Sequence, residues 1–227
     1  MTNPLLVQFS GQQVMFGGEQ SAQVKAHLDA GMSHPDFARM TAYSAEAYEG
    51  DFWDTTRWES RYRPYNVVDG VLQIPVFGVL MRNFPFTAGF ATGYEYIREA
   101  FTRGMDDGNV KGVALIVDSP GGVVNGNSNL VDLMFARRGE KPVQAFIDGA
   151  AYSAAYNVAS AADQIVIDRA AGAGSIGVRT THVSWSKYNE KMGLDYTIVF
   201  AGEGKTDGDP DLDLSAEAQA RMQSRVN

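Results

Sequence analysis

A serine, a lysine and a pair of glycines are the residues of this chain whose types and spacing could support catalysis. Ser153 lies in the stretch GAAYSAAYNVASAAD (149–163), where an apolar strand ends at Gly149 and an alanine-rich helix begins near the serine. This arrangement places the hydroxyl at a helix N-terminus, where free backbone N–H groups favour developing negative charge. A serine in this position is a nucleophile if a base lies nearby. Without a base, it is a simple helix cap.

Two glycines could supply the second part of such a site. The sequence DSPGG (118–122) follows a buried apolar run, and glycines there leave backbone N–H groups open to close approach by a ligand. We interpret it as an oxyanion hole that pairs the N–H of Gly122 with the N–H of Ala154, each donor stabilising a transition state by about 3 kcal/mol. An ordinary strand-to-helix turn is the alternative. Neither the G-x-S-x-G elbow nor a phosphate-binding loop is matched.

Two residues are candidates for the general base. Lys205 lies in the glycine-flanked turn AGEGKTDG, and His182 follows a polar Arg-Thr-Thr. A lysine acts as a base only when burial depresses its pKa. The acidic neighbours of Lys205 would oppose this if they faced its amine: Glu203, Asp207, Asp209, Asp211 and Asp213. His182 would instead complete a Ser-His-Asp triad with an aspartate.

The elements that must position these residues alternate from about residue 67 onward. Strands are predicted at 67–80, 111–122, 141–149, 163–169 and 194–202, and helices at 92–108, 127–139, from Ser153, and near 182–193. The near-continuous apolar run of 111–122 is typical of a strand in a parallel sheet covered on both faces. The alternation predicts an α/β domain with right-handed crossovers.

Residues 1–66 follow a different pattern, which predicts an N-terminal arm or small helical subdomain. Two helices are predicted at 19–31 and 35–50, each closed by a glycine, and the aromatic and basic stretch RWESRYRPY (57–65) follows. This region is either a surface extension packed on the main domain or an arm that docks a partner.

Composition excludes several classes of function. The 227 residues carry a net charge of -8 without a basic cluster, so nucleic acid is not an expected partner. Cysteine is absent, which excludes disulfides and thiolate chemistry. The acidic run 207–213 fails the calcium-loop pattern, with Leu212 and Ala218 at key positions, so we expect no metal and no cofactor. No signal peptide or membrane span is predicted, and we expect a cytoplasmic location.

Four segments together carry a family resemblance over residues 67–227. DSPGG, GAAYSAAYNVASAAD, GAGSIGV and AGEGKTDGDP occur in this order. The set resembles the signal peptide peptidase A family of Ser-Lys peptidases, and more closely its phage branch, the prohead (capsid maturation) proteases. The lysine site reads KTDGDP here, where the branch typically has Lys-Val-Asp-Gly-Asn-Pro, so the lysine, aspartate, glycine and proline are kept.

The resemblance implies a Clp protease/crotonase-like α/β fold with repeated β-β-α units. It implies that Ser153 is the nucleophile, that Lys205 is the general base and that the Ser175 hydroxyl orients the lysine amine. The backbone N–H groups of Gly122 and Ala154 would form the oxyanion hole. It also implies homo-oligomeric rings, in which the serine and the lysine of one site can come from different subunits.

We therefore expect a serine endopeptidase with a Ser-Lys dyad that cleaves scaffold and capsid proteins during phage head maturation, in the host cytoplasm or the prohead interior. Four alternatives stay open: a bacterial signal-peptide-degrading peptidase, a Clp-like Ser-His-Asp peptidase, a crotonase-type acyl-CoA enzyme and a non-catalytic assembly protein. Family members usually continue past the residue at which this sequence stops, Asn227. The C-terminal part of the family domain is therefore expected to be absent from it.

Overall fold

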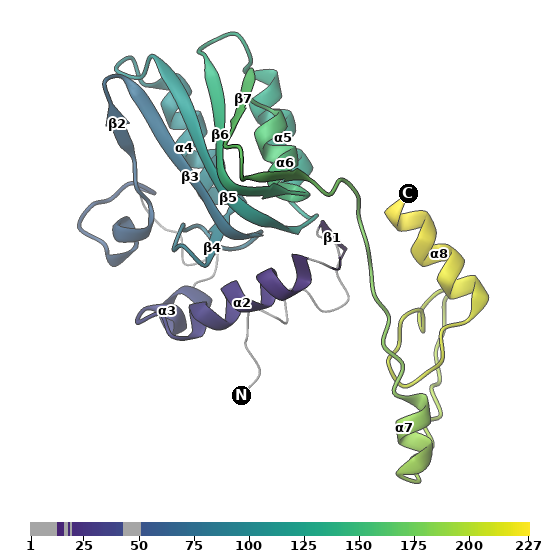
Figure 1. Cartoon of the computed structure of the whole chain (residues 1–227). Coiled ribbons are helices and arrows are strands. Elements are labelled where there is room, and N and C mark those ends of the chain that lie inside the picture. Colours follow the sequence, from purple (N-terminus) through teal and green to yellow (C-terminus); the bar gives the residue numbers. More distant parts are fainter. Residues whose placement is uncertain (1–12, 16–17, 19, 43–50) are drawn as a thin grey trace.

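A mostly parallel β-sheet forms the centre of the molecule in a computed structural model (Figure 1), which describes residues 13–15, 18, 20–42 and 51–227. The order of its main strands is β2-β3-β5-β6-β7. Their bounds are Asn66–Val68 for β2, Val71–Met81 for β3, Gly112–Val123 for β5, Val143–Tyr152 for β6 and Gln164–Ile167 for β7. Strands β3, β5, β6 and β7 pair in parallel, and β2 pairs with β3 in the antiparallel sense. The predicted α/β class with a parallel sheet is confirmed.

Three short strands extend the sheet at the carboxyl ends of the long ones. β4 (Ala91–Gly93) pairs in parallel with the end of β3, and β8 (Gly172–Gly174) pairs in parallel with the end of β6. β1 (Val14–Met15) pairs with the end of β5 in the antiparallel sense. In open parallel sheets the carboxyl edge is where polar side chains and ligands meet. The predicted site residues other than the two candidate bases, Lys205 and His182, belong to the segments near this edge.

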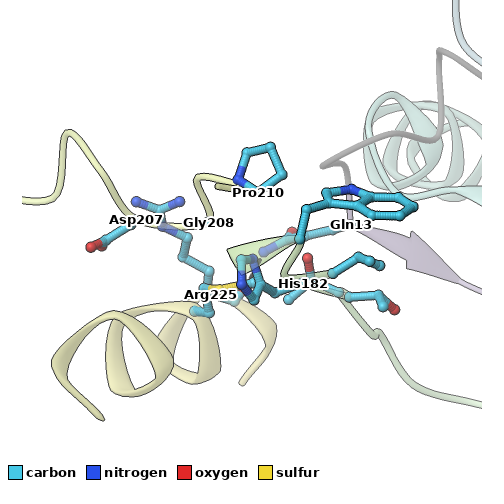
Figure 2. A pocket seen from close by; sticks show the side chains of 11 residues that line it. Gln13, His182, Asp207, Gly208, Pro210 and Arg225 are labelled. Atoms are coloured by element: carbon cyan, nitrogen blue, oxygen red, sulfur yellow. Dashed lines mark hydrogen bonds between the residues drawn. The ribbon is translucent and has the colours of Figure 1, made fainter. Parts of the chain in front are cut away.

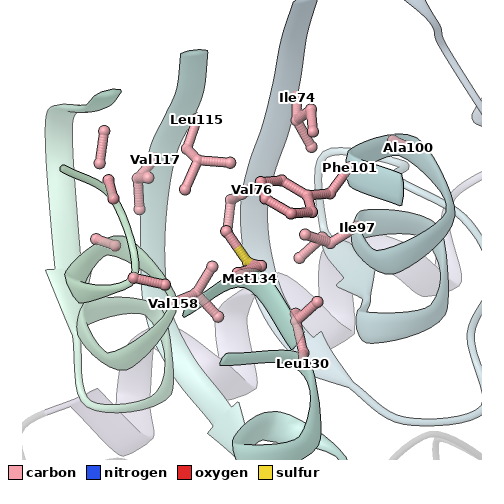
Figure 3. Packing of buried hydrophobic residues seen from close by; sticks show 14 of the residues in the cluster. Ile74, Val76, Ile97, Ala100, Phe101, Leu115, Val117, Leu130, Met134 and Val158 are labelled. Atoms are coloured by element: carbon pink, nitrogen blue, oxygen red, sulfur yellow. The ribbon is translucent and has the colours of Figure 1, made fainter. Parts of the chain in front are cut away.

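Three helices pack on the sheet and enclose the main hydrophobic core (Figure 3). They are α4 (Tyr94–Asp106), α5 (Asn127–Ala136) and α6 (Ala154–Ser160), and each follows a strand as predicted. Each apolar side chain of this size contributes about 1.5–3 kcal/mol on full burial. The buried residues labelled in Figure 3 come from two strands and all three helices: Ile74, Val76, Ile97, Ala100, Phe101, Leu115, Val117, Leu130, Met134 and Val158.

The N-terminal helices pack on a second apolar cluster around the ends of β3 and β4. α2 (Gln20–Met32) confirms the predicted helix at 19–31. α3 (Phe37–Ala42) is the described part of the helix predicted at 35–50, and residues 43–50 lie outside the described residues. A short 3-10 helix, η2 (Trp58–Tyr62), follows. The cluster joins Val24, Leu28, Phe37 and Met40 to Val79, Met81, Phe84, Phe86 and Phe90. The division into an arm and a peptidase domain at residue 66 stays a prediction.

Residues 180–227, named here the C-terminal lobe, lie apart from the sheet in Figure 1. The lobe contains α7 (Ser186–Lys191), which is shorter than the helix predicted near 182–193, and α8 (Ala216–Val226), which was not predicted. The predicted strand at 194–202 is wrong. These residues have no partner strand among the described residues, and their apolar side chains Leu194, Tyr196, Val199 and Phe200 stay exposed.

Within the described ranges, none of the helices is long and apolar enough to cross a membrane.

Candidate active site

Ser153 occupies the sharp turn between β6 and α6. Its backbone has φ 55° and ψ -114°, a conformation that residues with a side chain rarely adopt and that costs on the order of 1–3 kcal/mol. The turn is held by β8, because the Ser153 N–H donates to the Gly174 carbonyl at 2.7 Å. Strand pairing therefore places the serine where the sheet ends and the helix begins.

The Ser153 side chain is buried without a hydrogen-bond partner. The residue is 2% exposed, and its Oγ bonds to no other described residue. The side chain also makes no capping bond to α6, so it does not act as the helix cap that the sequence left open. A buried hydroxyl without a partner costs about 1–3 kcal/mol. Strain and an unsatisfied hydroxyl at one residue together favour a functional role for Ser153.

The two predicted oxyanion donors lie at the same edge of the sheet as this serine. β5 and β6 are parallel, Ser119 is paired with Ala151, and Gly122 and Ala154 each follow three residues later. A Cβ added at Gly122 would lie 1.9 Å from the Leu80 carbonyl oxygen, so only glycine fits there. The structure thus brings together the segments that carry Ser153, Gly122 and Ala154. Their catalytic roles stay predictions.

Two residues that the sequence analysis did not single out support this edge. The buried Asn127 side chain donates to the Ala154 carbonyl at 3.1 Å and accepts a bond from Asn157 at 2.6 Å. The Tyr94 hydroxyl donates to the Val123 carbonyl at 2.6 Å, and burial raises the pKa of Tyr94, which keeps this donor protonated. An asparagine at the start of a helix is typical of an ordinary helix cap. The partners of Asn127 are about 30 residues away in the sequence, so no local pattern predicts these hydrogen bonds.

Ser175 and Ser153 each lie one residue past the end of a strand, and these two strands are neighbours in the sheet. Tyr152 of β6 pairs in parallel with Gly174 of β8, so the two serines occupy the next position of adjacent strands. Both have φ 55°. The Ser175 hydroxyl donates to Gln20 Oε1 at 3.4 Å. Ser175 and Ser153 are therefore neighbours through their backbones, and the role of the Ser175 hydroxyl in orienting a lysine amine stays a prediction.

Lys205 is not brought to this edge within one chain. It lies in the C-terminal lobe, in the loop between α7 and α8, which Figure 1 shows well away from the sheet. Its side chain is exposed, and no described residue forms a hydrogen bond or ion pair with its amine. The lobe thus presents the lysine to solvent while Ser153 is buried in the body of the fold.

The acidic neighbours of Lys205 bond to other groups. Arg221 donates to Asp207 at 2.6 and 2.8 Å, and these bonds hold the pKa of Asp207 below its usual value. The remaining carboxylates are also engaged within the lobe: Glu203 with Arg221, Asp209 with the Asp211 N–H, Asp211 with Asn189, and Asp213 with Ser184 and Ser186. None of the described carboxylates therefore forms an ion pair with the Lys205 amine.

His182, the competing candidate base, lines a pocket of about 450 Å³ between the C-terminal lobe and Gln13 (Figure 2). The pocket is also lined by Gln13, Asp207, Pro210 and Arg225. The His182 Nε2 is buried and bonds to no described residue. Ser153 is not among the residues that line this pocket, so the chain does not bring His182 and Ser153 together. Elsewhere in the described part of the chain, no group of three or more metal-ligating side chains is placed to hold an ion.

Comparisons with known proteins support the resemblance predicted from the motifs. Residues 136–227 match Peptidase family S49. The head-tail preconnector protein GP5 of Enterobacteria phage P21 is 36% identical over 167 residues, which are 73% of this chain and 33% of that protein. The capsid assembly protease C of Escherichia phage lambda is 32% identical over 167 residues, or 73% of this chain and 38% of that protein. The chain spans only about a third of the length of these relatives. The predicted resemblance to this peptidase family and its phage branch is confirmed.

Solved structures with partial similarity are enoyl-CoA hydratases. One is an enoyl-CoA hydratase/isomerase family member, with a TM-score of 0.38 and 17% identity over 59% of this chain and 53% of that chain. Another, from Mycobacterium smegmatis, has a TM-score of 0.38 and 17% identity over 55% of this chain and 51% of that chain. Similarity this low does not assign a function to this chain, and the α/β fold class rests on the strand order described above.

Proposed function

We propose that this chain is a serine peptidase with a Ser-Lys dyad that cleaves scaffold and capsid proteins during phage head maturation. The observation that carries the proposal is Ser153, which has a strained backbone and a buried hydroxyl without a hydrogen-bond partner among the described residues. The match to Peptidase family S49 supports peptide-bond hydrolysis. The names of the phage relatives, a capsid assembly protease and a head-tail preconnector protein, support the substrate class.

The reaction needs only groups of the protein and water. The neutral Lys205 amine takes the proton of Ser153 Oγ, and the oxygen attacks the carbonyl carbon of the substrate peptide bond. The N–H groups of Gly122 and Ala154 stabilise the negative oxygen of the tetrahedral intermediate. The lysine then donates the proton to the leaving amine, and water hydrolyses the acyl-enzyme.

Within this proposal, the lysine of one copy serves the serine of another. β7 is the last strand on its side of the sheet, and its Ile165, Val166 and Ile167 are exposed. The stretch 194–200, which lies just before Lys205 and has several exposed apolar side chains, forms neither a helix nor a strand. An exposed strand edge is a ready template for an added strand. A strand added to β7 in parallel would end at the edge that holds Ser153 and bring the lysine that follows it to that edge.

Labelling with a serine-reactive fluorophosphonate tests the function. We expect mass spectrometry to find one adduct, on Ser153, and none on the folded Ser153→Ala variant. The labelling should require a protein concentration at which copies associate, as measured by light scattering. Absence of an adduct from the associated protein would count against a peptidase and in favour of a crotonase-type or non-catalytic relative, neither of which needs this serine.

A further inference from the structure

Strand β1 lies directly against the end of β5 that carries Gly122. Val14 pairs with Val123, and Met15 pairs with Gly122, in the antiparallel sense. The Val124 N–H donates to the Gln13 carbonyl at 3.3 Å. Hydrogen-bonded and non-hydrogen-bonded pairs alternate along antiparallel strands. Met15 and Gly122 are therefore the next hydrogen-bonded pair, and the Gly122 N–H faces the backbone of Met15.

The second edge of β1 is bonded as well. The Val14 N–H donates to the Arg179 carbonyl at 3.0 Å, and the Arg179 N–H donates to the Val14 carbonyl at 3.0 Å. β1 thus lies between the end of β5 and the segment that leads into the C-terminal lobe. An extended segment bonded through its backbone on both edges is bound in the way that proteins bind peptides by strand addition.

Side chains of the same N-terminal region contact two further parts of the candidate site. Gln20, at the start of α2, accepts the hydrogen bond of the Ser175 hydroxyl at 3.4 Å. Gln13 Nε2 donates to the Arg225 carbonyl of α8 at 2.6 Å, which ties β1 to the lobe that carries Lys205. The N-terminal region therefore contacts a predicted oxyanion donor, the predicted lysine-orienting serine and the lobe of the predicted base.

From these contacts we propose that residues 13–15 occupy the substrate groove as a built-in substrate mimic and inhibit the peptidase until they are displaced. The groove lies between Gly122–Val124 and Arg179, and it binds an extended polypeptide antiparallel to the end of β5. The Met15 carbonyl takes the place of the carbonyl that Ser153 attacks. This inference rests on the proposed function, because it takes Gly122 as an oxyanion donor. The family match begins at residue 136 and does not cover β1.

A reversible disulfide across β1 and β5 tests the proposal in the full chain. The chain has no cysteine of its own, so the double variant Val14→Cys/Val123→Cys can form only one intramolecular disulfide. These two residues form a non-hydrogen-bonded pair, in which the Cα atoms lie about 4.5 Å apart, within the range of a disulfide. Oxidation would fix β1 in the groove, and reduction would release it. The two single variants are the matched controls.

Two readouts separate this proposal from the proposed function. One is the rate of fluorophosphonate labelling of Ser153. The other is binding of a fluorescent peptide with the sequence of residues 11–18, GQQVMFGG. We expect the oxidised double variant to label at least tenfold more slowly than the reduced form and to bind the peptide at least tenfold more weakly. The single variants should show no redox dependence. A full-length Val14→Pro variant, which loses the N–H that donates to Arg179, should label faster than the wild type.

Equal labelling and equal peptide binding in both redox states would overturn the proposal, as would a folded Val14→Pro variant that labels no faster than the wild type. If Ser153 is labelled in no state while peptide binding still depends on the disulfide, the proposed peptidase function fails and the occupation of the groove by β1 stands. Labelling that is strong and equally fast in all forms has the reverse meaning: the serine is reactive, and β1 does not inhibit it.

Discussion

The region around Ser153 and the C-terminal lobe that carries Lys205 are built in opposite ways. Ser153 and Ala154 are buried and held by the register of β5, β6 and β8. Lys205 is exposed, in a loop whose carboxylates bond mainly to other groups of the lobe. A single chain therefore fixes the position of the proposed nucleophile and leaves the proposed base, Lys205, without a fixed environment.

Replacing the base should have the largest effect on activity. We expect Lys205→Ala to reduce peptide hydrolysis by about 10²- to 10⁴-fold, the usual contribution of a general base. Lys205→Arg should be equally inactive, because a guanidinium does not lose its proton. His182→Ala should keep most of the wild-type rate. The opposite pattern, with activity lost at His182 and kept at Lys205, would favour the Clp-like Ser-His-Asp alternative.

Mixing two inactive variants sharpens the same comparison. Ser153→Ala keeps a working Lys205, and Lys205→Ala keeps a working Ser153. If the lysine acts between copies, mixed assemblies contain intact sites, and the rate of peptide hydrolysis should recover on mixing. A mixture that associates by light scattering and stays inactive would show that serine and lysine must come from the same chain.

Gly122→Ala should disturb the nucleophile region more than any loop glycine. The added Cβ would lie 1.9 Å from the Leu80 carbonyl oxygen, so β3 and β5 must move apart. Overpacking of this kind typically costs about 1–3 kcal/mol of unfolding free energy. Gly108→Ala is the matched control, because a Cβ there meets nothing within 4 Å. Urea denaturation measures both variants, and equal midpoints would contradict the strand contact at Gly122.

Asn127→Ala should weaken the support of Ala154. The variant leaves the buried Ala154 carbonyl and the Asn157 amide without the partner they have now. Leaving buried polar groups unsatisfied costs about 1–3 kcal/mol. Asn157→Ala removes a half-buried side chain and should cost less. Thermal unfolding measures this difference, and an Asn127 variant as stable as the wild type would show that water or a rearranged side chain replaces the amide.

The smallest effect is expected in the lobe, where the bonds from Arg221 lower the pKa of Asp207. A carboxyl whose folded-state pKa is lowered stabilises the folded state above its unfolded pKa, and this contribution is lost as the pH falls through the folded-state value. The protection factors for hydrogen exchange in α8, which correct for the intrinsic pH dependence of exchange, should therefore fall below about pH 4, the ordinary range of aspartate. In Asp207→Asn these protection factors should be low already at neutral pH, while those in α4 stay unchanged.

The central sheet could be predicted from sequence because its signals are local. The apolar run at 111–122 became β5, and the alternation of strands with amphipathic or alanine-rich stretches gave α4, α5 and α6. The stretch 194–202 has the composition of a strand, yet it forms none, because a strand needs a partner and this chain supplies no described one. The pairing of β1 with β5 joins residues that are distant in sequence and left no local pattern.

The candidate site divides in the same way. Motifs pointed to Ser153, Ser175, Gly122 and Ala154, and the register of parallel strands brings their segments to one edge. The backbone strain at Ser153 and the absence of a described hydrogen-bond partner for its hydroxyl could not be predicted, because the sequence fits a helix cap equally well. Whether Lys205 is buried depends on what contacts the C-terminal lobe, and the sequence around the lysine does not predict those contacts.

If Lys205 of one copy serves Ser153 of another, as proposed above, the open edge of β7 makes activity depend on how many copies are close together. An enzyme that borrows its base through such an edge loses specific activity on dilution and gains it when many copies share a small volume. Under this proposal, confinement of many copies in a small volume would switch the enzyme on, and dilute copies in a large compartment would stay inactive.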